Sequence, residues 1–210
     1  TDSGSYLYPD PTTVAVIEVK NISKSFAGHQ VLNNVSVEFH PGKVNFIIGR
    51  SGSGKSVLTK CIVGLMEVDQ GEIFFDNRNF TTLDRWDRKD IRQEMGMLFQ
   101  GSALFSSLNV EENILFPLQM FSSMSKSEML DRVNVCLKRV NLEGKNKLYP
   151  SELSGGMQKR TGIARAIAMN PRYLFCDEPN SGLDPQTAIV IDNLIREITY
   201  EFKSTTVVIS

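Results

Sequence analysis

The stretch Gly49-Arg50-Ser51-Gly52-Ser53-Gly54-Lys55-Ser56 has the spacing G-x-x-x-x-G-K-[ST]. It follows a short apolar run at 44–48, which predicts a strand buried on both faces, and it precedes a helical pattern expected over 54–65. Glycines let a backbone bend so that several N–H groups point inward, and the start of a helix adds partial positive charge. A strand, loop and helix in this order form a phosphate cradle, so the stretch predicts nucleotide binding.

Two side chains of this P-loop carry specific expectations. Lys55 should reach the β- and γ-phosphates and serve in catalysis, and the Ser56 hydroxyl should be a ligand of Mg²⁺. Backbone contacts to ATP are expected from the rest of the loop and the residue after it: Gly49, Arg50, Ser51, Gly52, Ser53, Gly54 and Val57. A P-loop alone does not separate kinases, GTPases, helicases and transport ATPases. The sequence holds no N-K-x-D-like base reader of the kind that a GTPase needs.

Composition excludes several other classes of protein. The 210 residues are 41% apolar and 22% charged with a net charge of −1, which predicts one globular domain without a basic excess for nucleic acid. Three scattered cysteines and two histidines make a zinc site or a disulfide framework unexpected and suit a reducing, cytosolic setting. No apolar run approaches the ~18 residues of a membrane-spanning helix, so no direct membrane insertion is expected.

Strand and helix patterns alternate at both ends of the chain. Residues 1–13 suggest a flexible tail, and 14–210 a single α/β domain whose mostly parallel sheet is covered by helices. A helical subdomain is expected to be inserted at about 80–150, with capping boxes that begin at Asn109 and Ser125. Further strands are predicted at 14–19, 31–39, 71–75, 95–99, 173–176 and 205–209, and further helices at 155–169 and 184–202.

The apolar strand at 173–176 ends in two carboxylates. Asp177 is placed to hold Mg²⁺, and Glu178 is a candidate general base for the attacking water. Acidic residues after a strand often only begin a solvated loop. In a sheet that also carries a P-loop, however, ligands bind at the carboxyl ends of the strands, which favours the catalytic interpretation.

A second candidate anion site is Leu153-Ser154-Gly155-Gly156, just before a predicted helix. Taken alone, Ser154 would be a simple helix cap. The order of motifs is more informative: P-loop, Leu-Ser-Gly-Gly, apolar-Asp-Glu-Pro, and then Ser181-Gly182-Leu183-Asp184. This order resembles the ATP-binding subunit of ABC transporters over about 14–210. The resemblance implies an ABC-type P-loop fold with an antiparallel β portion, and ATP hydrolysis coupled to a membrane permease.

The same resemblance implies roles for single residues. Gln100 matches the Q-loop glutamine that contacts Mg²⁺ or the attacking water, and Phe26 stands where an aromatic ring stacks on adenine, although a core Phe is the alternative. Ser154, Gly155 and Gly156 would contact ATP held by a second copy of the chain, and Asp184 would lie at that dimer interface. Two monomers arranged head to tail would thus enclose two ATP molecules, and hydrolysis would let the pair open.

One departure from the family pattern is expected to matter. The family has a switch histidine after the strand predicted here at 205–209, whereas the sequence ends at Ser210. His29 and His40 both precede the P-loop and do not fit that role. We expect a truncation before the switch histidine, and a chain that binds ATP but turns it over poorly. Cys176, beside Asp177, fits a small buried hydrophobe better than a redox group.

Two stretches narrow the kind of transporter. Residues 97–105 (MLFQGSALF) and 150–157 (PSELSGGM) resemble the ATPase of Mla-type intermembrane phospholipid transport systems, although both also fit generic importers. The resemblance implies a cytosolic ATPase on the inner-membrane face of a bacterium with two membranes. Residues 102–119 would meet the permease, with Leu104 and Phe105 either exposed for docking or buried in the subdomain core.

Two other function classes compete with a transport ATPase. Soluble ABC-type ATPases that clamp DNA carry long coiled-coil arms, and no such heptads are present here. The ribosome-binding class carries a second cassette, for which 210 residues leave no room. A module that only binds ATP is disfavoured by Glu178, the candidate base.

Overall fold

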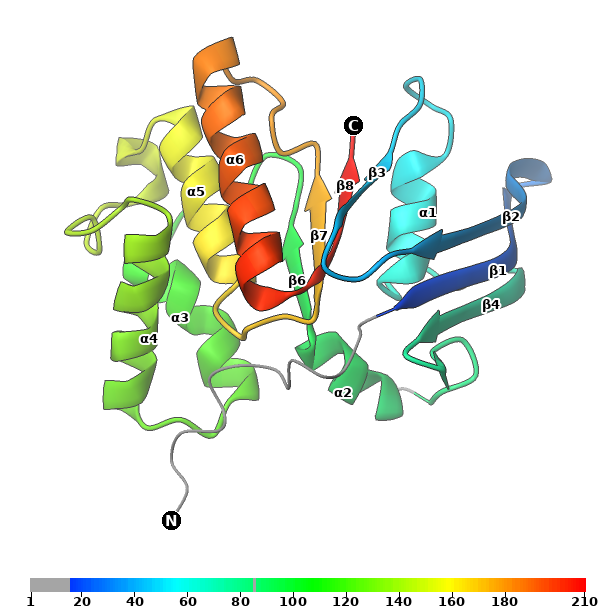
Figure 1. The fold of residues 1–210 in the computed structure, drawn as a ribbon, viewed down its shortest axis with the longest axis horizontal. Helices are drawn as coiled ribbons and strands as arrows, with labels where there is room; N and C mark the ends of the chain where they lie inside the picture. The colour runs from blue at the N-terminus through cyan, green and yellow to red at the C-terminus, as the bar shows by residue number, and fades with distance from the viewer. Residues whose placement is uncertain (1–15, 85) are drawn as a thin grey trace.

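The computed structural model describes residues 16–84 and 86–210, which form two four-stranded sheets flanked by helices (Figure 1). The tail expected at 1–13 lies outside the described residues. The first sheet is antiparallel, in the order β2 (His29–Phe39), β1 (Ile17–Phe26), β4 (Gln70–Phe75), β5 (Arg78–Asn79). The second is parallel, in the order β3 (Val44–Ile47), β8 (Thr205–Ile209), β7 (Tyr173–Asp177), β6 (Met95–Leu98). The prediction of a mostly parallel central sheet with an antiparallel portion is confirmed.

The helices begin where the sequence places caps. Both capping boxes are present, at Asn109 with Glu112 before α3 (Val110–Phe121) and at Ser125 with Glu128 before α4 (Lys126–Arg139). Asp184 caps α6 (Pro185–Phe202), as predicted, and Ser154 caps α5 (Gly155–Ala166), the role expected of Ser154 when it is taken alone. The remaining helices are α1 (Lys55–Ile62), α2 (Asp87–Gln93) and the short η1 (Pro150–Glu152).

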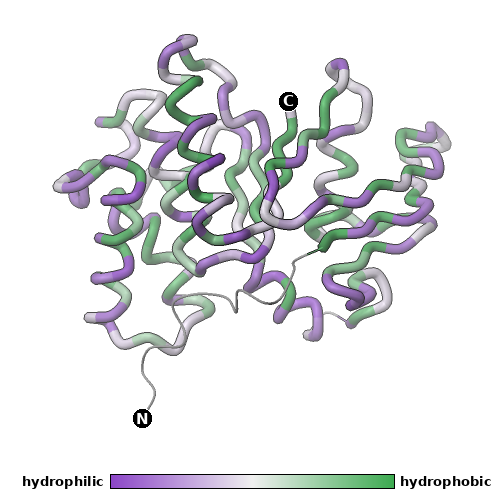
Figure 2. Tube along the Cα trace, in the orientation of Figure 1, coloured by the Kyte–Doolittle hydropathy of each residue, from purple (hydrophilic) through white to green (hydrophobic). Residues whose placement is uncertain are grey.

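Hydrophobic cores lie on both faces of the parallel sheet. Along β7, Tyr173 and Phe175 join the core beside α1 and the antiparallel sheet, whereas Leu174 and Cys176 join the core beneath α3 to α6. In Figure 1, α3 to α6 therefore lie on one side of the parallel strands and α1 on the other. The hydropathy colouring of Figure 2 shows green central strands and purple outer loops. Burial on both faces explains the unbroken apolar run at 173–176.

Several boundary predictions are wrong, each for a local reason. The run at 44–48 is not buried on both faces, because β3 is an end strand of the described sheet, and Phe46 and Ile48 are 58% and 78% exposed. The first helix stops at Ile62 rather than at residue 65, two residues before Gly64, which has a left-handed φ of 70°. The range 80–150 includes β6, a strand of the parallel sheet, so the helical insertion proper begins after it.

Candidate functional site

The carboxyl ends of the parallel strands bring three predicted motifs to one edge of the sheet. The P-loop follows β3, Gln100 follows β6, and Asp177 and Glu178 come at the end of β7. All of these strands point upward in Figure 1. This edge is where ligands bind in open α/β sheets.

The P-loop has the backbone that a phosphate cradle requires. Gly52 and Gly54 have φ values of 77° and 94°, a region that residues with a side chain rarely enter. A Cβ at Gly49 would lie 2.8 Å from Ser53 Oγ. No side chain caps the N-terminus of α1, and its first turn carries no acidic residue, so the N–H groups there remain available to an anion.

Lys55 is folded over this loop. Its ammonium donates to the carbonyl oxygens of Gly49 at 2.5 Å and Arg50 at 3.2 Å. The charge is thus held against the loop at which the phosphates would bind. Ser56 is exposed beside it, so its hydroxyl is free to reach a cation. The positions of these residues fit the binding of a nucleoside triphosphate together with Mg²⁺.

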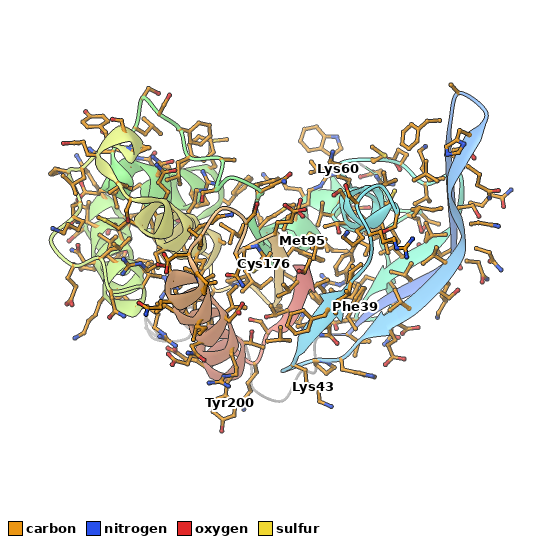
Figure 3. All side chains as sticks on the ribbon, turned by 90° about the horizontal axis from the view of Figure 1, so that it is seen from above. Phe39, Lys43, Lys60, Met95, Cys176 and Tyr200 are labelled. Atoms are coloured by element: carbon orange, nitrogen blue, oxygen red, sulfur yellow. The ribbon has the colours of Figure 1, made fainter. Side chains whose placement is uncertain are left out.

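Asp177, the predicted Mg²⁺ ligand, ends β7 at this edge of the sheet. Partial burial, together with the neighbouring Glu178 carboxylate, raises the pKa of Asp177, and Lys60, Lys159 and Lys55 only partly oppose this. An added divalent cation would stabilise the charged form, so the site is electrostatically suited to Mg²⁺. Figure 3 places Cys176, the residue before Asp177, in the middle of the molecule between the helical side and α1.

Glu178 is held in an unusual backbone conformation. Its φ is 45°, in the left-handed region, and its N–H donates to the Ile209 carbonyl at 3.0 Å. Its carboxylate accepts a hydrogen bond of 2.7 Å from the Gln100 amide. The structure therefore brings the predicted base and the predicted Q-loop glutamine into direct contact.

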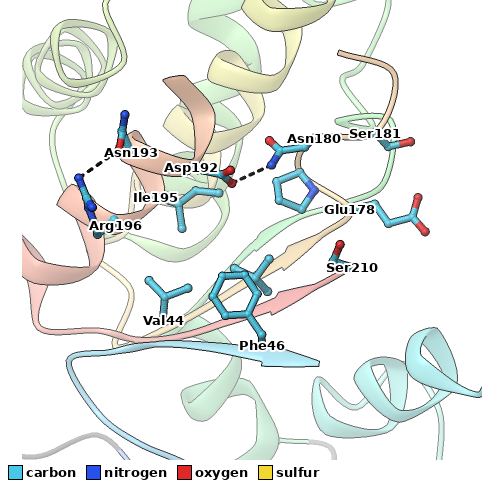
Figure 4. Close-up of a pocket in the computed structure, with 12 residues that line it drawn as sticks. Val44, Phe46, Glu178, Asn180, Ser181, Asp192, Asn193, Ile195, Arg196 and Ser210 are labelled. Atoms are coloured by element: carbon cyan, nitrogen blue, oxygen red, sulfur yellow. Dashed lines mark hydrogen bonds between the residues drawn. The ribbon is translucent and has the colours of Figure 1, made fainter. Parts of the chain in front are cut away.

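A cleft of about 690 Å³ runs from Glu178 along α6. In Figure 4, Glu178 and Ser210 lie at one end and Asn193 and Arg196 at the other. Asn180 donates to Asp192 at 2.7 Å on the way. Glu178 thus lines this cleft, and in Figure 4 its carboxylate points away from the α6 end of the cleft.

Phe26 ends β1 and is 40% exposed. The Lys24 ammonium lies 5.6 Å from the ring centroid and is also paired with Asp69 at 2.6 Å. The alternative of a buried core Phe is wrong. An exposed ring fits the predicted stacking role.

Ser154, Gly155 and Gly156 begin α5 at the same edge of the sheet but apart from the P-loop. The Ser154 hydroxyl accepts a hydrogen bond from the Met157 N–H at 3.3 Å. Gly156 lets α5 approach α6 closely, because a Cβ there would lie 2.6 Å from Thr187 Cγ2. In Figure 1 the N-terminus of α5 and the loop before α1 lie on opposite sides of β7 and β8. One chain therefore does not bring its two candidate anion sites together.

Asp184 is occupied by helix capping. Its Oδ1 accepts from the N–H groups of Gln186 and Thr187 at 3.0 Å each, and its Oδ2 accepts from the Thr187 hydroxyl at 2.6 Å. These hydrogen bonds lower the pKa of the exposed carboxyl. The residue stands one helix turn from the contact between Gly156 and Thr187, so Asp184 and the start of α5 belong to one surface.

Two charged residues of α5 make contacts that the sequence does not predict. Lys159 is 4% exposed and donates to the Glu178 carbonyl at 3.0 Å. Arg165 donates to the carbonyls of Ser102 and Ala103 at 2.8 and 2.9 Å. Helical periodicity could have indicated that Lys159 is buried, because it falls between Gly156 and Ile163 on the inward face of the helix, where a charge is unexpected.

The segment predicted to meet a permease is divided between core and surface. Leu104 packs partly buried against the helical core, whereas Phe105 is 43% exposed and contacts Phe116 in a tilted arrangement with ring centroids 4.8 Å apart. Met120 and Phe121, at the end of α3, are also exposed. Of the two alternatives, burial in the subdomain core thus holds for Leu104 and exposure holds for Phe105.

The composition also led to expectations about cysteines, metal sites and membrane-spanning helices. The three cysteines are buried and unpaired, and burial raises the pKa of Cys176 to about 12, which fits a hydrophobic role. Among residues 16–84 and 86–210, no cluster of His, Cys, Asp and Glu would hold a metal by itself. None of the helices in that part of the chain is both long and apolar enough to cross a bilayer.

Known proteins resemble this chain over most of its length. The family described as "ABC transporter" matches residues 32–181. The methionine import ATP-binding protein MetN of Clostridium tetani is 42% identical over 195 residues, which are 93% of this chain and 61% of that protein. The probable ribonucleotide transport ATP-binding protein mkl of Mycobacterium leprae is 38% identical over 194 residues, 92% of this chain and 56% of that protein. The chain thus spans less than two thirds of these relatives.

Solved structures agree in fold. The dimeric structure of MJ0796, a bacterial ABC transporter cassette, has a TM-score of 0.84 at 35% identity and covers 92% of this chain and 87% of that one. A post-hydrolysis state of MJ0796 bound to ADP and Pi has a TM-score of 0.83 at 34% identity, with the same coverage. The family match over more than half of the chain, together with these relatives, shows that the chain belongs to the ABC transporter family.

Proposed function

We propose that this chain is the ATP-binding and hydrolysing part of an ABC transporter. The observation that carries the proposal is the sheet edge where an uncapped P-loop helix, Asp177 and the pair of Glu178 and Gln100 lie together. Lys55 and the loop N–H groups would hold the triphosphate, and Ser56, Gln100 and Asp177 would hold Mg²⁺. Bound Mg²⁺ would neutralise charge on the phosphates. Glu178 would take the proton of the attacking water.

The functional unit in this proposal is a head-to-tail dimer. The anion site at Ser154, Gly155 and Gly156 is separate from the P-loop of its own chain (Figure 1). A second copy would supply it, so each ATP would lie between the P-loop of one chain and the Ser154 end of the other. Phe26 would stack on adenine, and Asp184 would lie at the dimer interface. The dimeric assembly of MJ0796 supports this arrangement.

The partner of the dimer would be a membrane permease, reached from the cytoplasmic face of a bacterial inner membrane. The exposed rings of Phe105 and Phe116 support the docking role predicted for 102–119. Phospholipid is our first candidate for the cargo, on the likeness of 97–105 and 150–157 to Mla-type ATPases. Import of another solute is the second, favoured by the 42% identity to a protein named for methionine import.

Nucleotide binding and turnover test the proposal separately. The chain should bind a fluorescent ATP analogue in the presence of Mg²⁺, and Lys55→Ala should abolish that binding. The whole protein should hydrolyse ATP, and Glu178→Gln should stop turnover while binding remains. Retained binding in Lys55→Ala would contradict the assigned phosphate site. Purification with the permease then identifies the cargo, since a copurifying solute-binding protein and amino-acid permease would contradict the lipid assignment.

A further inference from the structure

Lys159 is a buried cation whose position the roles assigned so far do not explain. It lies on α5 and is 4% exposed, and its ammonium group donates a hydrogen bond of 3.0 Å to the Glu178 carbonyl oxygen. Burial lowers the pKa of Lys159, against the opposing influence of Glu178, Asp177 and Cys176. A charged group is costly to bury unless it makes a specific interaction, so this hydrogen bond calls for an explanation.

The peptide that Lys159 contacts is the one that orients the candidate base. Glu178 has a φ of 45°, which is strained for a residue with a side chain. Its N–H is fixed by the Ile209 carbonyl at 3.0 Å, and its C=O is fixed by Lys159 at 3.0 Å. The two hydrogen bonds hold both polar groups of this residue's backbone. They therefore set the direction in which the carboxylate leaves the chain.

The carboxylate itself has no such rigid support. Among the described residues, only the side chain of Gln100 makes a hydrogen bond to this carboxylate, and Gln100 is itself exposed. Glu178 is thus held firmly at the backbone and loosely at the carboxylate. Loss of the Lys159 contact would release the backbone into other conformations and move the base.

We propose that Lys159 is a positioning residue, which holds the Glu178 backbone in the strained conformation that aims the carboxylate at the attacking water. The inference rests on the proposed ATPase function. It also has a geometric consequence. In a head-to-tail dimer, the N-terminus of α5 faces the nucleotide of the partner, whereas Lys159 acts on Glu178 of its own chain. A defect at Lys159 should therefore appear at the site that contains the P-loop of the same chain.

The first experiment measures ATP binding and steady-state hydrolysis by the whole protein carrying Lys159→Met. A misplaced catalytic group typically costs about 100-fold in rate. We expect kcat to fall by about that factor, with ATP binding and KM within about threefold of the parent. Lys159→Gln keeps an N–H donor, so its kcat should be at least about tenfold higher than that of Lys159→Met. If Lys159→Met does not fold, the kcat of Lys159→Gln tests the positioning role instead.

The matched control is Arg160→Met. Arg160 is the next residue on α5, but it donates to the carbonyls of Val140 and Asn141 at 3.3 and 3.0 Å, away from Glu178. Arg160→Met should leave kcat within about twofold of the parent. An equal loss of kcat in both variants would assign the effect to helix stability and overturn the proposal.

Mixed dimers show in which chain Lys159 acts. A dimer of one parent chain and one Lys55→Ala chain has one intact P-loop and sets the reference rate. Lys159→Met should slow the dimer when placed in the chain with the intact P-loop, and should leave the rate near the reference when placed in the Lys55→Ala chain. The opposite pattern would mean that Lys159 serves the Ser154 end of α5. A parent that neither binds nor hydrolyses ATP would refute the proposed function, whereas a parent that hydrolyses ATP and a Lys159→Met variant of equal kcat would refute only this inference.

Discussion

Alanine at Gly156 would test the close contact that places the start of α5 against α6. The added Cβ would lie 2.6 Å from Thr187 Cγ2. Carbon atoms in contact are about 3.5 to 4.0 Å apart, so one helix must move by about 1 Å. Overpacking of this kind costs about 1 to 3 kcal/mol. In a chain of this length each kcal/mol lowers Tm by about 2 to 4 °C, so we expect a decrease of about 2 to 12 °C.

Two further variants make the Gly156→Ala result specific. Gly155→Ala adds the same methyl group one residue earlier, where the nearest atom is Leu183 Cδ2 at an ordinary 3.5 Å, so its Tm should stay near that of the parent. Thr187→Ser removes Cγ2 but keeps the hydroxyl that donates to Asp184 at 2.6 Å. Combined with Gly156→Ala, it should restore most of the lost Tm, as measured by circular dichroism. Equal losses in the two alanine variants, or no recovery with Thr187→Ser, would refute the close-contact explanation.

Three other variants test single roles at the site. Glu178→Gln should lower kcat by about 100- to 10,000-fold with ATP binding kept, measured by phosphate release, and an unchanged kcat would remove the assigned base. Phe26→Ala should weaken ATP binding by roughly 5- to 100-fold, which is the value of one aromatic–base stack. The affinity for inorganic triphosphate, which has no base, should stay unchanged in a competition titration. Asp177→Asn should raise the free energy of unfolding in Mg²⁺-free urea titrations, because the raised pKa shows that folding disfavours the charged carboxylate. That cost is absent below the ordinary pKa of about 3.9, grows as pH rises from there to the raised pKa of the folded state, and is constant above it, so a gain that is larger at about pH 4 than at neutral pH would contradict it.

The sequence predicts the strands and caps that depend on local chemistry. Asn109 and Ser125 form the capping boxes that their Glu partners indicated, and the apolar run at 173–176 is the doubly buried β7. The similar run at 44–48 is half exposed instead. Apolar content is the same for a central strand and an end strand, because the position in the sheet depends on tertiary pairing that periodicity does not contain.

The site followed the same division. Motif spacing predicted the P-loop, Asp177 and Glu178, and the parallel strands bring them to one edge. The contact of Gln100 with Glu178 joins residues 78 positions apart, and nothing local indicates it. Lys159 was missed because a lysine on a helix is normally solvated, whereas here the packing of α5 in the fold buries its side chain at the Glu178 carbonyl.

Complementation between two variants shows whether one nucleotide site is built from two copies of the chain. Lys55→Ala should inactivate the P-loop, and Ser154→Arg should block the anion site at the start of α5. Each variant alone should then form no intact site, whereas a mixed dimer should contain one site with both intact halves. Mixing the two purified variants should restore ATP-dependent dimers in analytical ultracentrifugation, together with bound nucleotide. If mixing restores neither, or if Ser154→Arg alone dimerises with ATP as well as the parent does, the two-chain site is contradicted.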